Sequence, residues 1–176
     1  YPRVGDPVLG VWTHRQALAA RDAGAEVEVV VLHRPVPPSR RLRDPDAWRR
    51  ALREPRRREL DGLPVTTVRY LSPARTGHYG RWGAYAAPPL RFPFDRVHAH
   101  NAVPAADAVL RARIGAPLVV SVHGGDVLFT ARRNPAWRRT VERAYAAAQL
   151  VLANSSGTER LVREHGAQHT RVVRLG

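Results

Sequence analysis

The sequence predicts an α/β fold built on a doubly wound parallel sheet. Short, almost uniformly apolar segments such as residues 117–123 alternate with longer segments whose apolar residues recur every three or four positions. Glycine or proline stands at many of the boundaries between them. Apolar strands separated by helices are typical of a parallel sheet that is covered by helices on both faces. At 176 residues, one domain is the simplest expectation.

The first half of the chain mixes this pattern with two irregular excursions that are rich in arginine and proline. The β-branched run "VEVVVLH" predicts a strand, and Gly24 is placed to end the helix before it. The predicted elements are, in order, a helix within residues 14–25, a strand at Val27–His33, an excursion over 34–64 with one short helix around Trp48, a strand at Val65–Tyr70, and an excursion over 72–94.

The second half is more regular. Asn134 and Pro135 open one predicted helix, in which Trp137, Val141, Ala144, Tyr145 and Ala148 share a face. Ser156 and Glu159 have the spacing of a capping box, with Ser156 as the N-cap of a helix that ends near Gly166. The predicted elements are strands at 95–100, 117–123, 150–155 and 171–176, and helices at 104–115, 135–148 and 156–166.

Composition limits the function classes. The formal net charge is +14, yet all 29 basic residues are arginine, methionine and cysteine are absent, and isoleucine occurs once, at Ile114. This bias is typical of a bacterial gene of high G+C content, so we do not interpret the charge as a nucleic-acid-binding surface. The absence of cysteine excludes disulfides, thiol catalysis and cysteine-ligated metals. The apolar runs are shorter than a membrane span requires, so we expect a soluble, globular protein. The location that we expect for it is the cytoplasm.

Ligands of parallel α/β sheets bind beyond the carboxyl ends of the strands, so those ends are the candidate site. Gly10 comes directly before the first helix, where free amides favour an anion such as a phosphate; a tight turn explains the glycine equally well. His98 and His100 lie two apart on a predicted strand and therefore share a face. "NAVP" after His100, beginning with Asn101, follows the same strand end.

The segment "HGGD" is the strongest candidate for chemistry. His123 ends an apolar strand, and Gly124 and Gly125 leave room for a ligand to approach the imidazole and the backbone amides. Asp126 either accepts a substrate hydroxyl or caps a loop or helix. After the next strand, Asn154 and Ser155 are expected to line the same cleft with polar groups.

Other readings of these residues remain open. His98, His100, His123 and Asp126 together have the composition of a metal site, which would indicate a histidine-dependent metal hydrolase. A basic module that binds nucleic acid or anionic lipid is a non-catalytic alternative. The sequence contains no G-x-G-x-x-G after a strand, no lysine for a Walker motif and no G-x-S-x-G, so the common dinucleotide, P-loop and hydrolase classes are excluded.

Three segments in this order and spacing resemble the amino-terminal domain of family-4 glycosyltransferases: "GVWTHRQALAARDAGAEVEVVV", "FDRVHAHNAVPAADAVLRARIGAPLVVSVHGGDV" and "AQLVLANSSGTERLVREHGA" with the closing "RVVRLG". The resemblance covers most of the chain from Gly5. It implies one Rossmann-like half of a GT-B enzyme, which moves a sugar from a nucleotide-diphosphate sugar to an acceptor hydroxyl with retention and without a metal.

The resemblance also implies roles for particular residues. Gly10 corresponds to the glycine loop near the donor diphosphate, and His123 to the cleft histidine that contacts the reacting sugar or acceptor. His123 would position and stabilise the reacting groups while the leaving phosphate takes the acceptor proton. The residues expected to line the acceptor side of the cleft are His100, Asn101, Gly124, Gly125, Asp126, Asn154 and Ser155.

The departures from the family pattern carry expectations too. The family's first strand precedes the glycine loop and its carboxyl-terminal half holds most of the donor, so we expect both to be missing from this chain and the fragment alone to be inactive. The expected partners are the donor, a sugar, lipid or small-molecule acceptor, and the missing half. A further hypothesis is that the arginine-rich segments select an anionic acceptor or contact the inner face of the cell membrane.

Overall fold

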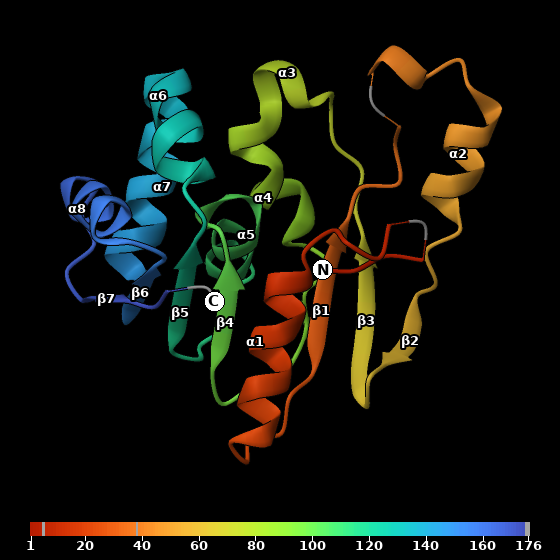
Figure 1. The fold of residues 1–176 in the computed structure, drawn as a ribbon. Helices are drawn as coiled ribbons and strands as arrows, with labels where there is room; N and C mark the ends of the chain where they lie inside the picture. The colour runs from red at the N-terminus through yellow and green to blue at the C-terminus, as the bar shows by residue number, and fades with distance from the viewer. Residues whose placement is uncertain (5, 38, 175–176) are drawn as a thin grey trace. The chain divides into compact units, whose positions relative to one another are not determined.

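Two sheets organise the chain in a computed structural model that describes residues 1–4, 6–37 and 39–174 (Figure 1). One sheet lies in Tyr1–Leu71, here called unit 1, and the other in Ser72–Gly176, unit 2. Unit 2 contains a four-stranded, all-parallel sheet with helical connections, which confirms the predicted Rossmann-like α/β class. In the described residues, no helix is both long and apolar enough to cross a membrane.

Unit 1 contains a mixed sheet in the order β1-β3-β2. β1 pairs with β3 in parallel and β2 pairs with β3 antiparallel. The short helix predicted around Trp48 is present as α2, and Asp44 caps it by accepting from the amides of Asp46 and Ala47. The elements are α1 (Val11–Asp22), β1 (Val29–His33), a turn at Ser39–Arg41, α2 (Pro45–Leu52), β2 (Arg57–Leu60) and β3 (Leu63–Arg69).

The excursion over 34–64 is more ordered than the sequence analysis predicts. Residues 57–60 form β2, and β3 begins at Leu63 and not at Val65. Asp61 and Gly62 connect the two strands with φ angles of 51° and 77°, and Leu60 pairs with Leu63. Aspartate followed by glycine is a strong signal for a two-residue hairpin, because both positions need a positive φ. The expectation of an irregular segment was wrong here.

Unit 2 carries its strands in the order β4-β5-β6-β7, which is also their order along the chain. Each connection between consecutive strands is helical. The elements are α3 (Arg75–His78), a turn at Tyr79–Arg81, α4 (Trp82–Ala86), β4 (Val97–His100), η3 (Ala102–Ala106), α5 (Asp107–Arg111), β5 (Leu118–Val122), η4 (Asp126–Thr130), α6 (Ala131–Arg133), α7 (Pro135–Ala147), β6 (Leu150–Ala153), α8 (Ser156–Glu164) and β7 (Thr170–Val172).

The two faces of the unit 2 sheet differ in chemistry. Right-handed crossovers between consecutive neighbouring strands place their helices on one face. Ala99, Val120 and Val151 lie on that face, and they belong to one buried apolar cluster with side chains of α5, α7 and α8. Because side chains alternate along a strand, the other face carries the intervening residues, which include His98 and Ser121. The apolar core therefore leaves the polar strand residues on the opposite face.

Several predicted boundaries need correction. Ser155, and not Ser156, is the N-cap of α8, because the Ser155 hydroxyl accepts from the amide of Thr158. The predicted helix at 104–115 begins as the wide turn η3 and ends as α5 at Arg111. The last strand, β7, begins at Thr170, one residue before the start of the predicted strand. Residues 175–176 and Gly5 lie outside the described residues. By contrast, Asn134 caps α7 as expected.

Candidate functional site

Polar residues follow the carboxyl ends of three neighbouring strands in unit 2. β4 ends at His100, β5 at Val122 and β6 at Ala153, and the three strands are parallel and in register, with His100 opposite Ser121 and Val122 opposite Ala153. Parallel strands bring the loops that follow them to one edge of the sheet. The loops beginning at Asn101, His123 and Asn154 therefore lie along one rim, as the sequence predicts.

Three histidine rings form a stack on the polar face. The ring centroids of His98 and His100 lie 4.6 Å apart, and those of His100 and His123 lie 5.5 Å apart with planes only 13° from parallel. His100 Nδ1 lies 3.2 Å from His123 Nε2, and His98 Nε2 lies 2.7 Å from the hydroxyl of Ser121. β4 supplies two of the rings, and the end of β5 supplies the third together with the serine. The stack thus ends at the candidate residue His123.

The stack holds its imidazoles in the neutral form. Burial lowers the pKa of His100 to about 3, and the neighbouring imidazoles of His98 and His123 act in the same direction. Burial also lowers the pKa of His123. It lowers the pKa of His98 as well, with a further contribution from His123. At neutral pH the site therefore offers imidazole nitrogens and not imidazolium cations.

The two glycines after His123 differ in what they require. Gly124 has a φ of 90°, which disfavours any other residue, and it is buried. Gly125 has an ordinary helical backbone, and a Cβ there would meet no atom within 4 Å. Gly124 is therefore needed for the turn itself, whereas Gly125 leaves open space beside the strand end.

Asp126 is buried, with 2% of its surface exposed, and it binds backbone amides. Its Oδ2 accepts from the amide of Ala102 at 2.6 Å, and the amide of Val103 also contributes to its environment. Burial raises the pKa of Asp126 to about 6, and these two amides oppose the rise. The carboxyl group thus ties the loop after His123 to the loop after His100, which is the capping role considered in the sequence analysis.

Asn154 and Ser155 end the rim at β6. The Ser155 hydroxyl accepts from Thr158 N and lies 3.1 Å from the Thr158 hydroxyl, so it is engaged in starting α8. Asn154 Oδ1 is buried and has no hydrogen-bond partner among the described residues. Of the two, the Asn154 carbonyl is the group that is left to accept from a ligand.

Gly10 belongs to unit 1 and precedes α1. It has a φ of 69°, and a Cβ there would come within 2.6 Å of Tyr1 Cα, so the backbone alone explains the glycine. No side chain caps α1. Among the described residues, the amides of Trp12 and Thr13 in its first turn have no hydrogen-bond partner. These amides are compatible with a bound anion.

Sequence reasoning missed a polar cluster in unit 1. His14 is buried in α1, its Nε2 lies 2.7 Å from Asp61 Oδ2, and its Nδ1 lies 2.7 Å from the Tyr1 hydroxyl. Asp61 belongs to the hairpin turn between β2 and β3. The only signal in the sequence was the Asp-Gly pair of that turn, which predicts the hairpin but not its contact with α1.

The described residues contain no group of three or more histidine, aspartate or glutamate side chains placed to hold a metal ion. His100 Nδ1 and His123 Nε2 face each other at 3.2 Å, and His98 Nε2 lies 2.7 Å from the Ser121 hydroxyl. Asp126 is committed to Ala102. The metal-hydrolase reading therefore gains no support from the geometry.

A cavity of about 530 Å³ lies elsewhere in unit 2. It is lined by residues 90–95 and 112–117, which precede the amino ends of β4 and β5, and it includes the stacked rings of Phe92 and Phe94. None of the predicted site residues lines it. The rim at the carboxyl ends of β4, β5 and β6 remains the candidate site, because parallel strand pairing and hydrogen bonds bring its polar groups together.

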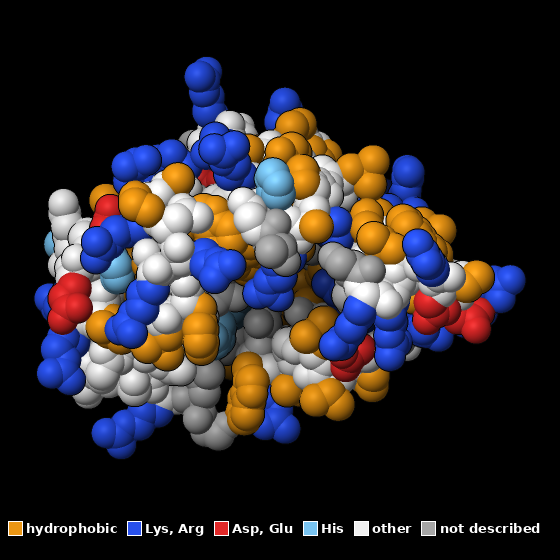
Figure 2. All heavy atoms as spheres, turned by 90° about the horizontal axis from the view of Figure 1, so that it is seen from above, with side chains coloured by type: hydrophobic (Ala, Val, Ile, Leu, Met, Phe, Trp, Pro, Cys, Tyr) orange, Lys and Arg blue, Asp and Glu red, His pale blue; other side chains and the backbone are white. Residues whose placement is uncertain are grey.

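Arginine side chains are dispersed over the face of the molecule that Figure 2 shows. Figure 2 shows blue side chains at many separate places in that view, with apolar and neutral groups between them. Several arginines form ion pairs with neighbouring carboxylates, such as Arg49 with Asp46 and Arg163 with Glu159. This distribution is typical of solvated charge spread over a protein surface.

Comparison with known proteins agrees with the geometry of unit 2. The family model described as Glycosyltransferase Family 4 matches residues 9–176, which is nearly the whole chain. No curated protein matches the sequence. The matched range contains Gly10 and every residue of the rim, from His100 to Ser155. The chain belongs to glycosyltransferase family 4.

Proposed function

We propose that the chain supplies the acceptor side of a glycosyltransferase that moves a sugar from a nucleotide-diphosphate sugar to an acceptor hydroxyl with retention at the anomeric carbon. The observation that carries this proposal is His123, a half-buried, neutral imidazole at the end of β5 beside the open space at Gly125. A neutral imidazole hydrogen-bonds sugar hydroxyls without placing a full charge beside the reacting carbon.

In the proposed reaction, the bond from the acceptor oxygen to the anomeric carbon forms on the same face from which the phosphate departs. The bond between the anomeric carbon and the phosphate oxygen breaks, and that oxygen takes the acceptor proton. His123 then holds and polarises the reacting groups and does not remove the proton itself. Its contribution is positioning and electrostatic stabilisation of the transition state.

The remaining rim residues would orient the acceptor. The free carbonyl of Asn154 is suited to accept from a sugar hydroxyl. His100 ends β4 next to His123, and Asn101 follows it. Asp126 acts through the backbone, because its carboxyl group holds the loop at Ala102 and is itself buried. In unit 1, the free amides after Gly10 are proposed to bind the donor diphosphate.

The test is transfer by the full-length protein with a panel of nucleotide sugars and acceptors. We expect His123→Ala to lower kcat by roughly 100-fold or more, in line with the loss of a positioning or electrostatic group. His169→Ala is the matched control, because His169 is exposed and takes part in no side-chain hydrogen bond among the described residues. Near wild-type turnover by the His123 variant would remove His123 from the mechanism.

Two further measurements decide the chemistry. The anomeric configuration of the product, followed by NMR from the start of the reaction, is expected to match that of the donor, and inversion would contradict same-face attack. The proposal needs no metal ion, so transfer is expected to persist after chelation. Activity that disappears with a chelator and returns with a divalent ion would contradict that part of the proposal.

A further inference from the structure

One face of the unit 1 sheet carries a group of polar side chains. His33, at the carboxyl end of β1, is paired with Arg69 of β3, and Arg58 of β2 is paired with Val65 of β3. Paired residues of neighbouring strands share a face, and so do residues two apart on one strand. Thr67 lies two positions from each of the two β3 residues. The four polar side chains therefore lie on one face of three adjacent strands.

Several polar atoms in this group lack a partner. Five buried side-chain atoms of this face and of the nearby Arg3 have no hydrogen-bond partner among the described residues. They are the Nε atoms of Arg3, Arg58 and Arg69, the hydroxyl of Thr67 and Nδ1 of His33. We call these five residues the arginine cluster. Folded proteins satisfy nearly all of their buried polar atoms, so five unpaired atoms in one cluster indicate a partner that the described residues do not supply.

The amino-terminal segment brings Arg3 to this face. The carbonyl of Pro2 accepts a hydrogen bond from Arg58. The amide of Val4 donates to Glu54 Oε2 at 3.2 Å, and Glu54 Oε1 lies 3.5 Å from the Arg58 guanidinium. Both neighbours of Arg3 are thus bound to the cluster or to the carboxylate beside it.

The arginine cluster has an excess of positive charge. Glu54 is the one buried carboxylate among the described residues of unit 1, and it stands against three guanidinium groups, which leaves two positive charges unbalanced. Burial lowers the pKa of His33, and Arg3 and Arg69 add to this effect while Glu54 opposes it, so these charges lie around one imidazole. Because unbalanced charge is costly away from water, a ligand with two negative charges would stabilise the cluster.

The carboxyl end of α2 holds two members of the cluster in place. Arg69 donates to the carbonyls of Leu52 at 3.1 Å and Glu54 at 2.6 Å. His33 Nε2 lies 2.7 Å from the carbonyl of Ala51, and because a carbonyl only accepts, Nε2 carries a proton. The free nitrogen, Nδ1, accepts from a ligand hydroxyl when the ring is neutral and donates to a ligand oxygen when the ring is protonated. It serves an oxyanion in both forms.

We propose that the arginine cluster binds a phosphate group. The three Nε–H groups and the Thr67 hydroxyl donate to the phosphate oxygens, His33 Nδ1 bonds a further oxygen, and two negative charges balance the cluster. A carboxylate suits it less well, because it carries one charge and two oxygens. All three arginines are half-buried, so the cluster meets solvent. The site goes beyond the proposed function and does not depend on it, since no member belongs to the rim or to the first turn of α1.

Binding can be measured without any transfer activity. The full-length protein, dialysed free of phosphate, is titrated with inorganic phosphate in a calorimeter at low salt. We expect saturable binding, and we expect acetate to bind roughly tenfold or more weakly, because it carries half the charge. No binding of phosphate, or equal binding of acetate, would overturn the proposal.

Free phosphate and the phosphate group of a substrate share this chemistry, and competition distinguishes them. Displacement of inorganic phosphate by one of a panel of sugar phosphates, but not by its parent sugar, identifies a phosphorylated substrate. Retention of inorganic phosphate against the whole panel identifies the free ion. Either result supports the site.

Two substitutions separate binding from stability. Arg3→Gln removes one donor and one charge, and we expect the affinity for phosphate to fall roughly tenfold. The Thr67 hydroxyl is buried without a partner among the described residues. Thr67→Val removes this hydroxyl at nearly constant shape, so we expect an equal or higher Tm together with roughly fivefold weaker phosphate binding.

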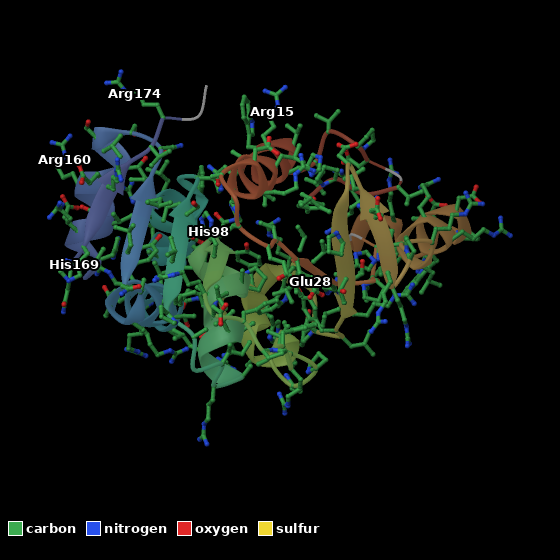
Figure 3. All side chains as sticks on the ribbon, turned by 90° about the horizontal axis from the view of Figure 1, so that it is seen from below. Arg15, Glu28, His98, Arg160, His169 and Arg174 are labelled. Carbon is green, nitrogen blue, oxygen red and sulfur yellow. The ribbon has the colours of Figure 1, made fainter. Side chains whose placement is uncertain are left out.

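Arg160→Gln is the matched control, because it makes the same change of charge on the exposed surface of α8. Figure 3 shows the Arg160 side chain extending outward from that helix, and we expect wild-type affinity for phosphate. Equal weakening in Arg160→Gln would indicate a general effect of charge and overturn the site. Unchanged affinity in both Arg3→Gln and Thr67→Val would place the bound phosphate elsewhere and would also overturn it. Because the titration needs neither donor nor acceptor, a failure of sugar transfer leaves this test unaffected.

Discussion

Asp126 makes the stability of the protein depend on pH in an unusual direction. Burial raises its pKa from 3.8 to about 6, so in the folded protein the carboxyl group holds its proton at pH values where the unfolded chain has lost it. The folded state therefore binds more protons between the two pKa values, and the free energy of unfolding falls as the pH rises through that interval. Across the whole interval between the two pKa values, the free energy of unfolding falls by about 3 kcal/mol because of this group.

The substitution Asp126→Asn removes this titration while nearly preserving the shape of the side chain. Between about pH 5 and about pH 8, we expect the stability of the variant to rise relative to the wild type by about 1.4 kcal/mol, which is the part of the effect in that range. The histidines of the stack titrate in both proteins, so their contribution cancels in the difference. The sign is the important point: the variant gains on the wild type as the pH rises.

The assay is denaturant unfolding of both proteins in a series of buffers, followed by circular dichroism. Asp95→Asn, which changes an exposed carboxylate of unit 2, is the reference for the loss of one negative charge. A stability difference between Asp126→Asn and wild type that does not change with pH would refute the reasoning. A difference that changes with pH in the opposite direction would also refute it. That result would mean that the two amides, and not burial, dominate the pKa of Asp126.

Two other predictions concern packing and charge. Gly83→Ala places a Cβ 2.7 Å from the Cβ of Asp107, a buried carboxylate that binds two arginines. We expect the free energy of unfolding to fall by roughly 2 kcal/mol and the Tm to fall by about 5 °C. Gly157→Ala, at the exposed start of α8, is the helical control, and equal Tm values for the two variants would contradict the clash. Neutralising the three exposed arginines of residues 40–43 is expected to weaken the binding of an anionic acceptor roughly tenfold at low salt and less at high salt. Binding is measured by titration calorimetry, and an unchanged affinity would exclude these side chains from acceptor selection.

The sequence was sufficient to predict the rim because its signals are local. An apolar strand that ends in His123 and two glycines predicts where the chain turns, and parallel pairing then gathers such ends at one edge. The hairpin at Asp61 was missed although its signal was present, because the arginine-rich surroundings concealed the short strand β2. The sequence predicts Ser156 as the cap of α8, but the cap is its neighbour Ser155. The prediction was wrong by one residue because both serines satisfy the capping pattern.

The connections between rim residues had no signal in the sequence. Asp126 binds the amide of Ala102, 24 positions earlier, and His123 meets His100 across 23 positions. Such contacts depend on strand register and on the path of each loop, which residue spacing does not specify. Which residues follow the strand ends could be predicted, but the hydrogen bonds between those residues required the structure.

The alternation along β5 has a consequence for folding. Val120 and Val122 belong to the buried cluster, while Ser121 and then His123 lie on the other face. A slip of one residue in the pairing of β5 would exchange the two sets, exposing valines and burying the histidine. Errors of register that would spoil the histidine stack are therefore also errors that expose apolar surface. A mispaired chain would therefore carry exposed valines, which favour aggregation over a folded but inactive state.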